Sequence, residues 1–125
     1  SPEQIRGEVL NVAPTDVPLP PSPYYGPLTG VTAARDGDFV LVTWNPLFLR
    51  AGDDSEQVPY VVEAWVCREG QVVFEPVGSY APSAEIRDEY GCSQPSHARV
   101  TAAEKHGYTP YVEVHWPPAP PPGEE

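Results

Sequence analysis

Residues 60–77, YVVEAWVCREGQVVFEPV, predict two β-strands joined by a tight turn. Within residues 60–68 and 71–77, apolar residues recur at every second position, as in a strand with one buried face. The Glu69-Gly70 pair between these two runs suits a turn. The residues that share one face of the first strand are Tyr60, Val62, Ala64 and Val66. This pattern predicts a strand whose apolar face packs into a core.

Five further strand-like runs lie on either side of this segment, at residues 30–34, 39–44, 84–88, 97–104 and 111–116. Gly, Pro, Asp and Ser separate them, and no long segment has the 3.6-residue period of a helix. Their apolar faces comprise Val40, Val42, Trp44, Ala98, Val100, Ala102, Val112, Val114 and Trp116. Seven short strands at this spacing predict an all-β sandwich or barrel.

The 125 residues have room for one domain with a substantial core and not for two. We expect that domain to span residues 28–116. Residues 1–27 form an N-terminal arm, in which a strand-like run, 5–12, precedes a segment with six prolines, 13–27. Residues 117–125, PPAPPPGEE, form a C-terminal tail. The proline density of residues 13–27 and 117–125 favours an extended polyproline II path in these two segments.

Charge and composition exclude several classes of function. Lys and Arg number 7 against 18 Asp and Glu, so the net charge is -11, which disfavours binding to a nucleic acid backbone. No stretch approaches the roughly 20 apolar residues of a membrane span. The chain has no methionine and begins Ser1-Pro2, as expected after signal-peptide removal, although trimming would leave the same sequence. With two cysteines, this suggests an extracellular or cell-surface protein.

Several motifs within 28–116 resemble those of a fibronectin type III domain, a member of the wider group of immunoglobulin-like sandwiches. They are Val40-x-Val42-x-Trp44 followed by Asn45-Pro46, then Tyr60-x-Val62, and then Val100-x-Ala102 with Gly107 five residues on. The resemblance implies a seven-stranded sandwich. One position departs from the family pattern, because Ser96 stands where the family usually has a corner tyrosine.

The resemblance also implies that the third and sixth strands are neighbours in one sheet. Cys67 and Cys92 would then lie close together at one end of the domain, and we expect them to form a disulfide. A metal or redox site that uses these cysteines with His97 and His106 is the alternative. Their spacing matches no familiar zinc module and there is no C-x-x-C motif, so we expect no metal.

No catalytic constellation is apparent in the sequence, and we expect neither an enzyme nor a cofactor. The histidines and serines lack a local nucleophile signature such as G-x-S-x-G. Adjacent carboxylates such as Asp88-Glu89 point to opposite faces in a strand and are usually solvated in a loop. Residues 51–56, AGDDSE, offer oxygen ligands for calcium but lack EF-hand spacing, which favours a polar loop.

The outer faces of the predicted sandwich carry apolar residues, although a face exposed to solvent is expected to be polar. Phe39 and Leu41 point away from the core face of their strand, so either the Pro-rich arm covers them or they bind another molecule. On the other sheet, the outward residues proposed as a ligand or partner face are Trp65, Arg99, Tyr111 and His115. Ion pairs of Arg99 with Glu63 and Glu113 are expected there.

Two functions follow from these features. The first is a non-enzymatic structural subunit that self-associates head-to-tail into an extracellular filament or surface layer. Its N-terminal strand, with Ile5, Val9, Leu10 and Val12, would add to a neighbouring subunit, and Phe39 and Leu41 would be the acceptor surface. The second is an adhesion, carbohydrate-binding, protein-binding or spacer module of a larger secreted protein, in which Trp65 and Tyr111 contact the ligand.

Overall fold

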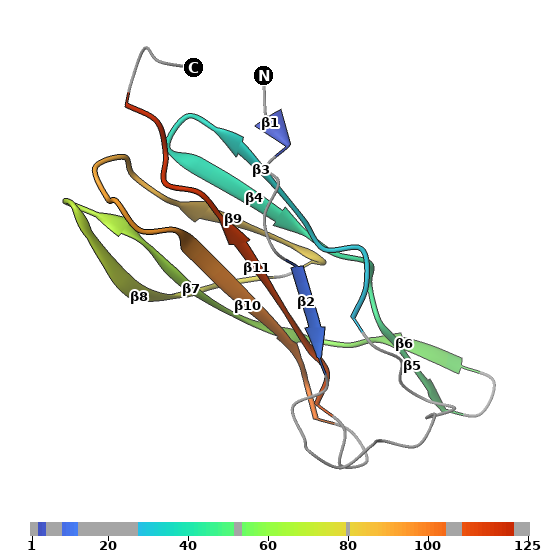
Figure 1. Cartoon of the computed structure of the whole chain (residues 1–125). Helices are drawn as coiled ribbons and strands as arrows, with labels where there is room; N and C mark the ends of the chain where they lie inside the picture. Colours follow the sequence, from blue (N-terminus) through green and yellow to red (C-terminus); the bar gives the residue numbers. More distant parts are fainter. Residues whose placement is uncertain are drawn as a thin grey trace.

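Two antiparallel β-sheets form the body of the protein in a computed structural model (Figure 1). The structure describes residues 3–4, 9–12, 28–51, 54–79, 81–104 and 109–121, and only the backbone at 3–4, 9–12, 48–51 and 54–57. All secondary structure in these residues is β, without a helix. The predicted all-β sandwich is therefore confirmed at the level of its class.

The smaller of the two sheets has four strands in the order β1-β3-β4-β9. Its strands are β1 (Glu3–Gln4), β3 (Thr32–Asp36), β4 (Phe39–Thr43) and β9 (Ser83–Arg87). The larger sheet has five strands in the order β2-β11-β10-β7-β8. Its strands are β2 (Val9–Val12), β11 (Tyr111–Trp116), β10 (Ser96–Ala102), β7 (Tyr60–Arg68) and β8 (Gln71–Val77).

All seven predicted strands of the domain are present, as β3, β4, β7, β8, β9, β10 and β11. β7, β8 and β11 have the expected bounds, whereas the other four differ by one or two residues at their ends. β7 and β10, the third and sixth of these strands, are hydrogen-bonded neighbours as expected. Glu69 and Gly70, in the turn between β7 and β8, both have positive φ, which explains the suitability of this pair for the turn.

A further hairpin, β5 (Phe48–Ala51) with β6 (Asp54–Gln57), was not predicted. It projects from one end of the sheets in Figure 1. The polar loop expected at residues 51–56 is wrong for this reason, since Ala51 pairs with Asp54 in the ladder. The sequence 54–57, DSEQ, has no apolar alternation that would indicate a strand. The side chains of the suggested calcium loop lie outside the described residues.

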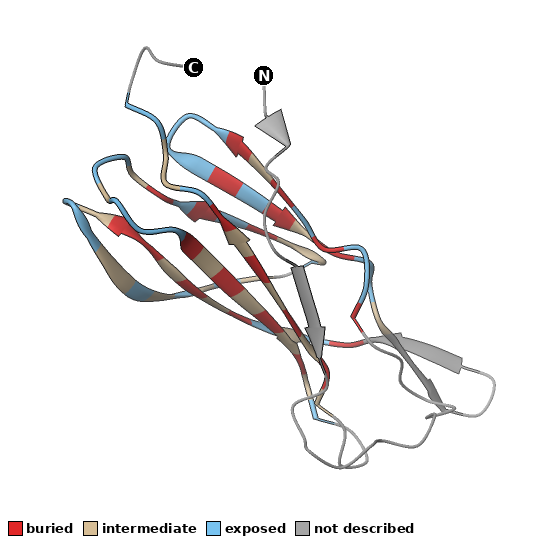
Figure 2. Ribbon diagram, viewed as in Figure 1, coloured by how far each residue is buried: buried red, intermediate tan, exposed pale blue. Residues whose placement is uncertain are grey.

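The core lies between the two sheets and is built from the predicted alternation. Figure 2 shows buried and partly buried positions alternating along β10. Every residue of the predicted core faces is buried except Tyr60, which is partly buried and packs its ring edge-on against Trp44 with centroids 5.2 Å apart. Burial of these side chains removes apolar surface from water and is the main force that holds the sheets together.

The N-terminal strand β2 extends the five-stranded sheet at its edge. It pairs with β11 of its own chain, from Tyr111 opposite Val12 to Val114 opposite Val9. Residues 13–27 separate it from the domain in sequence, and a segment of this length allows the strand to return to its own sheet. Ile5 and the Pro-rich segment lie outside the described residues.

A disulfide and a buried ion pair between Arg35 and Asp88 lie at one end of the sandwich. Cys67 and Cys92 are bonded, with Cα atoms 5.9 Å apart, which confirms the predicted pairing. Asp88 is fully buried there, so the interpretation of the Asp88-Glu89 pair as solvated is wrong for this residue. It continues the inward alternation of Ala84 and Ile86 beyond the end of β9.

Candidate interaction surface on the five-stranded sheet

The outer face of the five-stranded sheet carries two rows of side chains that cross the strands. Strand register places Phe74, Trp65, His97 and His115 opposite one another on β8, β7, β10 and β11, and we call these four residues the ring row. Two residues further along each strand lie Glu63, Arg99 and Glu113, which we call the charged row. The alternation that buries one face of β7, β10 and β11 turns these residues outward.

The rings of the ring row stack on one another across the sheet. Trp65 and His97 have centroids 4.5 Å apart with planes 8° from parallel, and His97 and His115 are 4.9 Å apart at 11°. Phe74 completes the row at 5.2 Å from Trp65, tilted by 54°. Because His97 lies between two parallel rings, both of its faces are covered. The row therefore offers ring edges to a ligand more than open ring faces.

Burial and neighbouring charges together lower the pKa of His97. Desolvation lowers the pKa of His97 below 6.5, the positive charges of His115 and Arg99 lower it further, and the carboxylate of Glu113 opposes them. Nε2 of His115 lies 3.7 Å from a carboxylate oxygen of Glu113, beyond hydrogen-bond distance, and this buried nitrogen has no hydrogen-bond partner among the described residues.

Within the charged row, Arg99 forms an ion pair with Glu113 and not with Glu63. Its Nε donates to Oε1 of Glu113 at 2.7 Å, and its Nη2 donates to the same oxygen. The guanidinium also lies 4.7 Å from the centre of the Tyr111 ring, a cation–π contact. The expected pair with Glu113 is confirmed, whereas Glu63 lies opposite Arg99 without an ion pair to any described residue.

Large apolar side chains are exposed on both outer faces of the sandwich. Val61 and Phe74 on the five-stranded sheet are 60% and 52% exposed, and Phe39 and Leu41 on β4 of the other sheet are 45% and 44% exposed. Within the described residues, nothing covers Phe39 and Leu41 enough to bury them. Both faces thus carry apolar surface of the kind that interaction sites use.

The structure brings all four residues of the predicted partner face together. Trp65 and His115 are in the ring row, Arg99 is in the charged row, and Tyr111 lies beneath the guanidinium of Arg99. Sequence reasoning considered His97 as a metal ligand and did not assign His97 or Phe74 to this face. The register of β10 would have selected His97, since the expected pairing with β7 and β11 places it between Trp65 and His115.

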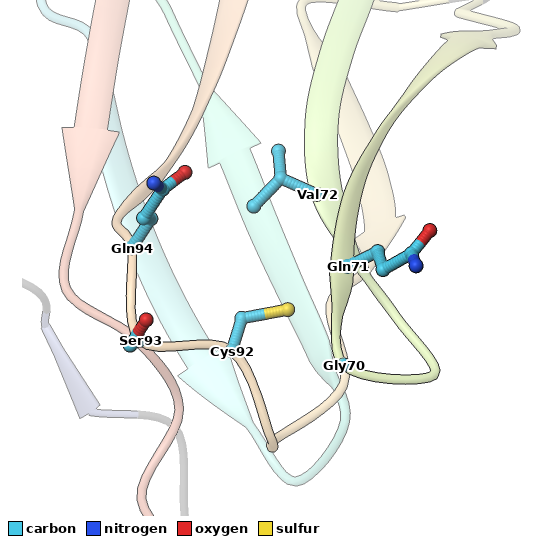
Figure 3. A pocket seen from close by; sticks show the side chains of 6 residues that line it. All are labelled: Gly70, Gln71, Val72, Cys92, Ser93 and Gln94. Atoms are coloured by element: carbon cyan, nitrogen blue, oxygen red, sulfur yellow. The ribbon is translucent and has the colours of Figure 1, made fainter.

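A separate pocket of about 280 Å³ lies beside the disulfide, between the β7–β8 turn and the loop before β10 (Figure 3). Its lining residues are Gly70, Gln71, Val72, Cys92, Ser93 and Gln94. None of them has a titratable side chain, because Cys92 is in the disulfide. The pocket therefore offers hydrogen bonds but no acid, base or charge.

The described part of the chain has neither a candidate metal site nor a candidate membrane-spanning helix. No group of three or more His, Cys, Asp or Glu residues there is arranged to hold a metal ion. No helix among the described residues has the length and apolar character needed to cross a membrane. Comparisons of the chain with family models, with curated proteins and with solved structures found no match.

Proposed function

We propose that this chain is a non-enzymatic β-sandwich module that binds another protein through the outer face of its five-stranded sheet. The observation that carries the proposal is the ring row, in which four rings are in contact across four strands. Phe74 of this row is exposed, and so is Val61, four residues from Trp65 along β7. Aromatic side chains mixed with a few charges are typical of protein interfaces.

Protein is favoured over carbohydrate by the way the rings stack. A sugar ring that packs on an aromatic side chain needs an open ring face, but Trp65 has His97 stacked on one side and Phe74 tilted against it on the other. Ring edges and aliphatic groups such as Val61 suit the side chains of a protein partner better.

The family and the location are part of the same proposal. The division of the seven domain strands into β3-β4-β9 and β11-β10-β7-β8 supports the resemblance to a fibronectin type III domain. The disulfide supports an extracellular or cell-surface location, because disulfides persist in oxidising compartments. Asp88, the buried carboxylate, is fully enclosed and hydrogen-bonded, so it has no access to a substrate.

A photo-crosslinking residue at Val61 tests the proposal in the native extracellular setting. The matched control carries the same residue at Glu85, which is exposed on β9 of the other sheet. We expect a defined protein adduct from position 61 only, and we expect Trp65→Ala to reduce its yield. Equal adducts from both positions, or an adduct that Trp65→Ala leaves unchanged, would contradict the proposal.

The second candidate function is the self-associating structural subunit, and the short β2–β11 pairing favours it. Among the described residues, four pairs hold β2 on the edge of the sheet, and a second copy offers the same edge. Exchange of β2 between copies would keep these contacts and join the molecules, with Phe39 and Leu41 as further contact surface.

Paired cysteines distinguish exchange between copies from pairing within one chain. Leu10 lies opposite Glu113 in the ladder. A chain with Leu10→Cys, mixed with a chain that carries Glu113→Cys, should form a disulfide-linked heterodimer if β2 is exchanged. The double variant in one chain is the control for pairing within a molecule. Crosslinking in the double variant alone would reject the exchange.

A further inference from the structure

The unpaired carboxylate of Glu63 indicates what kind of partner the proposed binding face accepts. Glu63 lies on β7, opposite Arg99 of β10 and Pro76 of β8. It is partly buried, and among the described residues it makes no ion pair. A carboxylate near the middle of a sheet face is therefore available to a group from outside the domain.

The geometry of Arg99 explains why Glu63 is left unpaired. Both Nε and Nη2 of Arg99 donate to Glu113, and its guanidinium packs over Tyr111. Glu113 and Tyr111 both belong to β11, so the arginine is held toward that strand and away from β7. One cation thus lies between two carboxylates and bonds to only one of them.

The two neighbours of Glu63 along its own strand on this face are apolar, in contrast to Arg99 across the strand. Val61 and Trp65 lie two residues away on the same face of β7, and Phe74 packs against Trp65. A partner that covers Val61 and Phe74 also removes water from Glu63. This costs free energy unless the partner provides a positive group, because a carboxylate buried without a counterion is strongly unfavourable.

We propose, as an extension of the proposed function, that Glu63 receives an arginine or lysine side chain of the partner protein, flanked by apolar side chains that cover Val61 and Phe74. The net charge of -11 attracts a basic partner at long range. The same charge opposes the approach of a second copy of this chain, which makes a basic partner the better fit.

Short peptides test this pairing in the full chain. The probes are acetyl-Val-Arg-Val-amide and the same peptide with citrulline, which keeps the shape of arginine without its charge. Binding is followed by NMR of the indole N–H signals. Trp65 reports on the face, whereas the buried Trp44 and Trp116 serve as internal controls for the fold. We expect the arginine peptide to shift the Trp65 signal, with an affinity about fivefold above that of the citrulline peptide.

Two variants complete the experiment. Glu63→Gln should lower the affinity for the arginine peptide to that of the citrulline peptide, whereas Glu85→Gln on the other sheet should leave it unchanged. Equal binding of the two peptides, or full binding by Glu63→Gln, would overturn the inference. A Trp65 shift that depends on protein concentration without peptide, together with dimers in sedimentation, would identify a second copy as the occupant and also overturn it.

The cation inference can fail while the proposed function holds. In that case, the adduct formed from position 61 would still depend on Trp65, but Glu63→Gln would not reduce its yield. If the adduct depends on neither residue, the proposed function itself fails.

Discussion

Arg35 of β3 and Asp88, which directly follows β9, form a buried ion pair in the interior of the sandwich, with Nη2 of Arg35 2.5 Å from Oδ2 of Asp88. Nη1 of the same arginine donates to the backbone carbonyl of Asp88 at 3.1 Å. The carboxylate also accepts hydrogen bonds from the backbone N–H of Cys67, from the Ser96 hydroxyl and from the indole of Trp116. Asp88 therefore connects β3, β7, β10 and β11 at the disulfide end of the sandwich.

Asp88→Asn should lower the free energy of unfolding by about 3 kcal/mol, because it leaves the charge of Arg35 buried without its counterion. Urea denaturation at pH 7 measures the loss. Glu85→Gln is the control, since this exposed residue should change the stability by less than about 0.5 kcal/mol. A loss below about 1 kcal/mol for Asp88→Asn would show that the network is not an important source of stability.

The same carboxylate predicts how stability depends on pH. Burial alone would raise the pKa of Asp88, but the hydrogen bonds from Cys67, Ser96, Arg35 and Trp116 outweigh it and hold this pKa below the ordinary value of 3.8. Between the folded and unfolded values, the unfolded chain binds more protons. The stabilisation from Asp88 is thus complete above pH 3.8 and is lost as the pH falls through the lower, folded value.

Urea denaturation of the wild type and Asp88→Asn over a series of pH values tests this dependence. We expect the difference between them to be constant from pH 7 to about pH 5 and to shrink below about pH 4. A difference that persists undiminished in acid would mean that the Asn variant loses packing rather than charge.

Replacement of both cysteines, Cys67→Ala with Cys92→Ala, should cost about 3.5 kcal/mol, since the disulfide closes a loop over a sequence separation of 25 residues. Thermal unfolding of the variant and the wild type, each with and without reductant, measures the effect. Reductant should lower the melting temperature of the wild type alone. An equal response of both proteins would attribute the effect to something other than this bond.

The fold was predictable where alternation and turn residues agreed. Val62, Ala64 and Val66 alternate with outward residues, and the Glu69-Gly70 turn fixes the start of the next strand, so β7 and β8 were predicted with their bounds. β5 and β6 were missed because pairing of backbones does not require an apolar face, and DSEQ has none.

The buried network was not predicted, although part of its signal is in the sequence. Arg35 follows Val31 and Ala33 in the inward alternation of its segment, just as Asp88 follows Ala84 and Ile86. Arg35 and Asp88 each come last in a row of alternating inward-facing residues. Their opposite charges indicate a buried ion pair only if the ends of these two segments are known to lie side by side in the fold. That information is tertiary, as is the register that stacks His97 between Trp65 and His115.

The ring row gives a prediction for histidine titration. By NMR, His97 should titrate below 6.5, because burial lowers its pKa and the charges of His115 and Arg99 add to this effect. His115→Gln should raise the pKa of His97, since it removes a positive charge. Glu113→Gln should lower the pKa of His97, since it removes a negative charge that favours the protonated imidazole.

The two variants are expected to shift the pKa of His97 in opposite directions. This distinguishes an electrostatic effect from a loosening of the ring row. If either variant only loosened the stack, His97 would become more exposed to water and its pKa would rise in both cases. Glu85→Gln, on the other sheet, is the control that should leave the titration of His97 unchanged. If Glu113→Gln instead raised the pKa of His97, exposure to water and not the charges on β11 would determine this pKa.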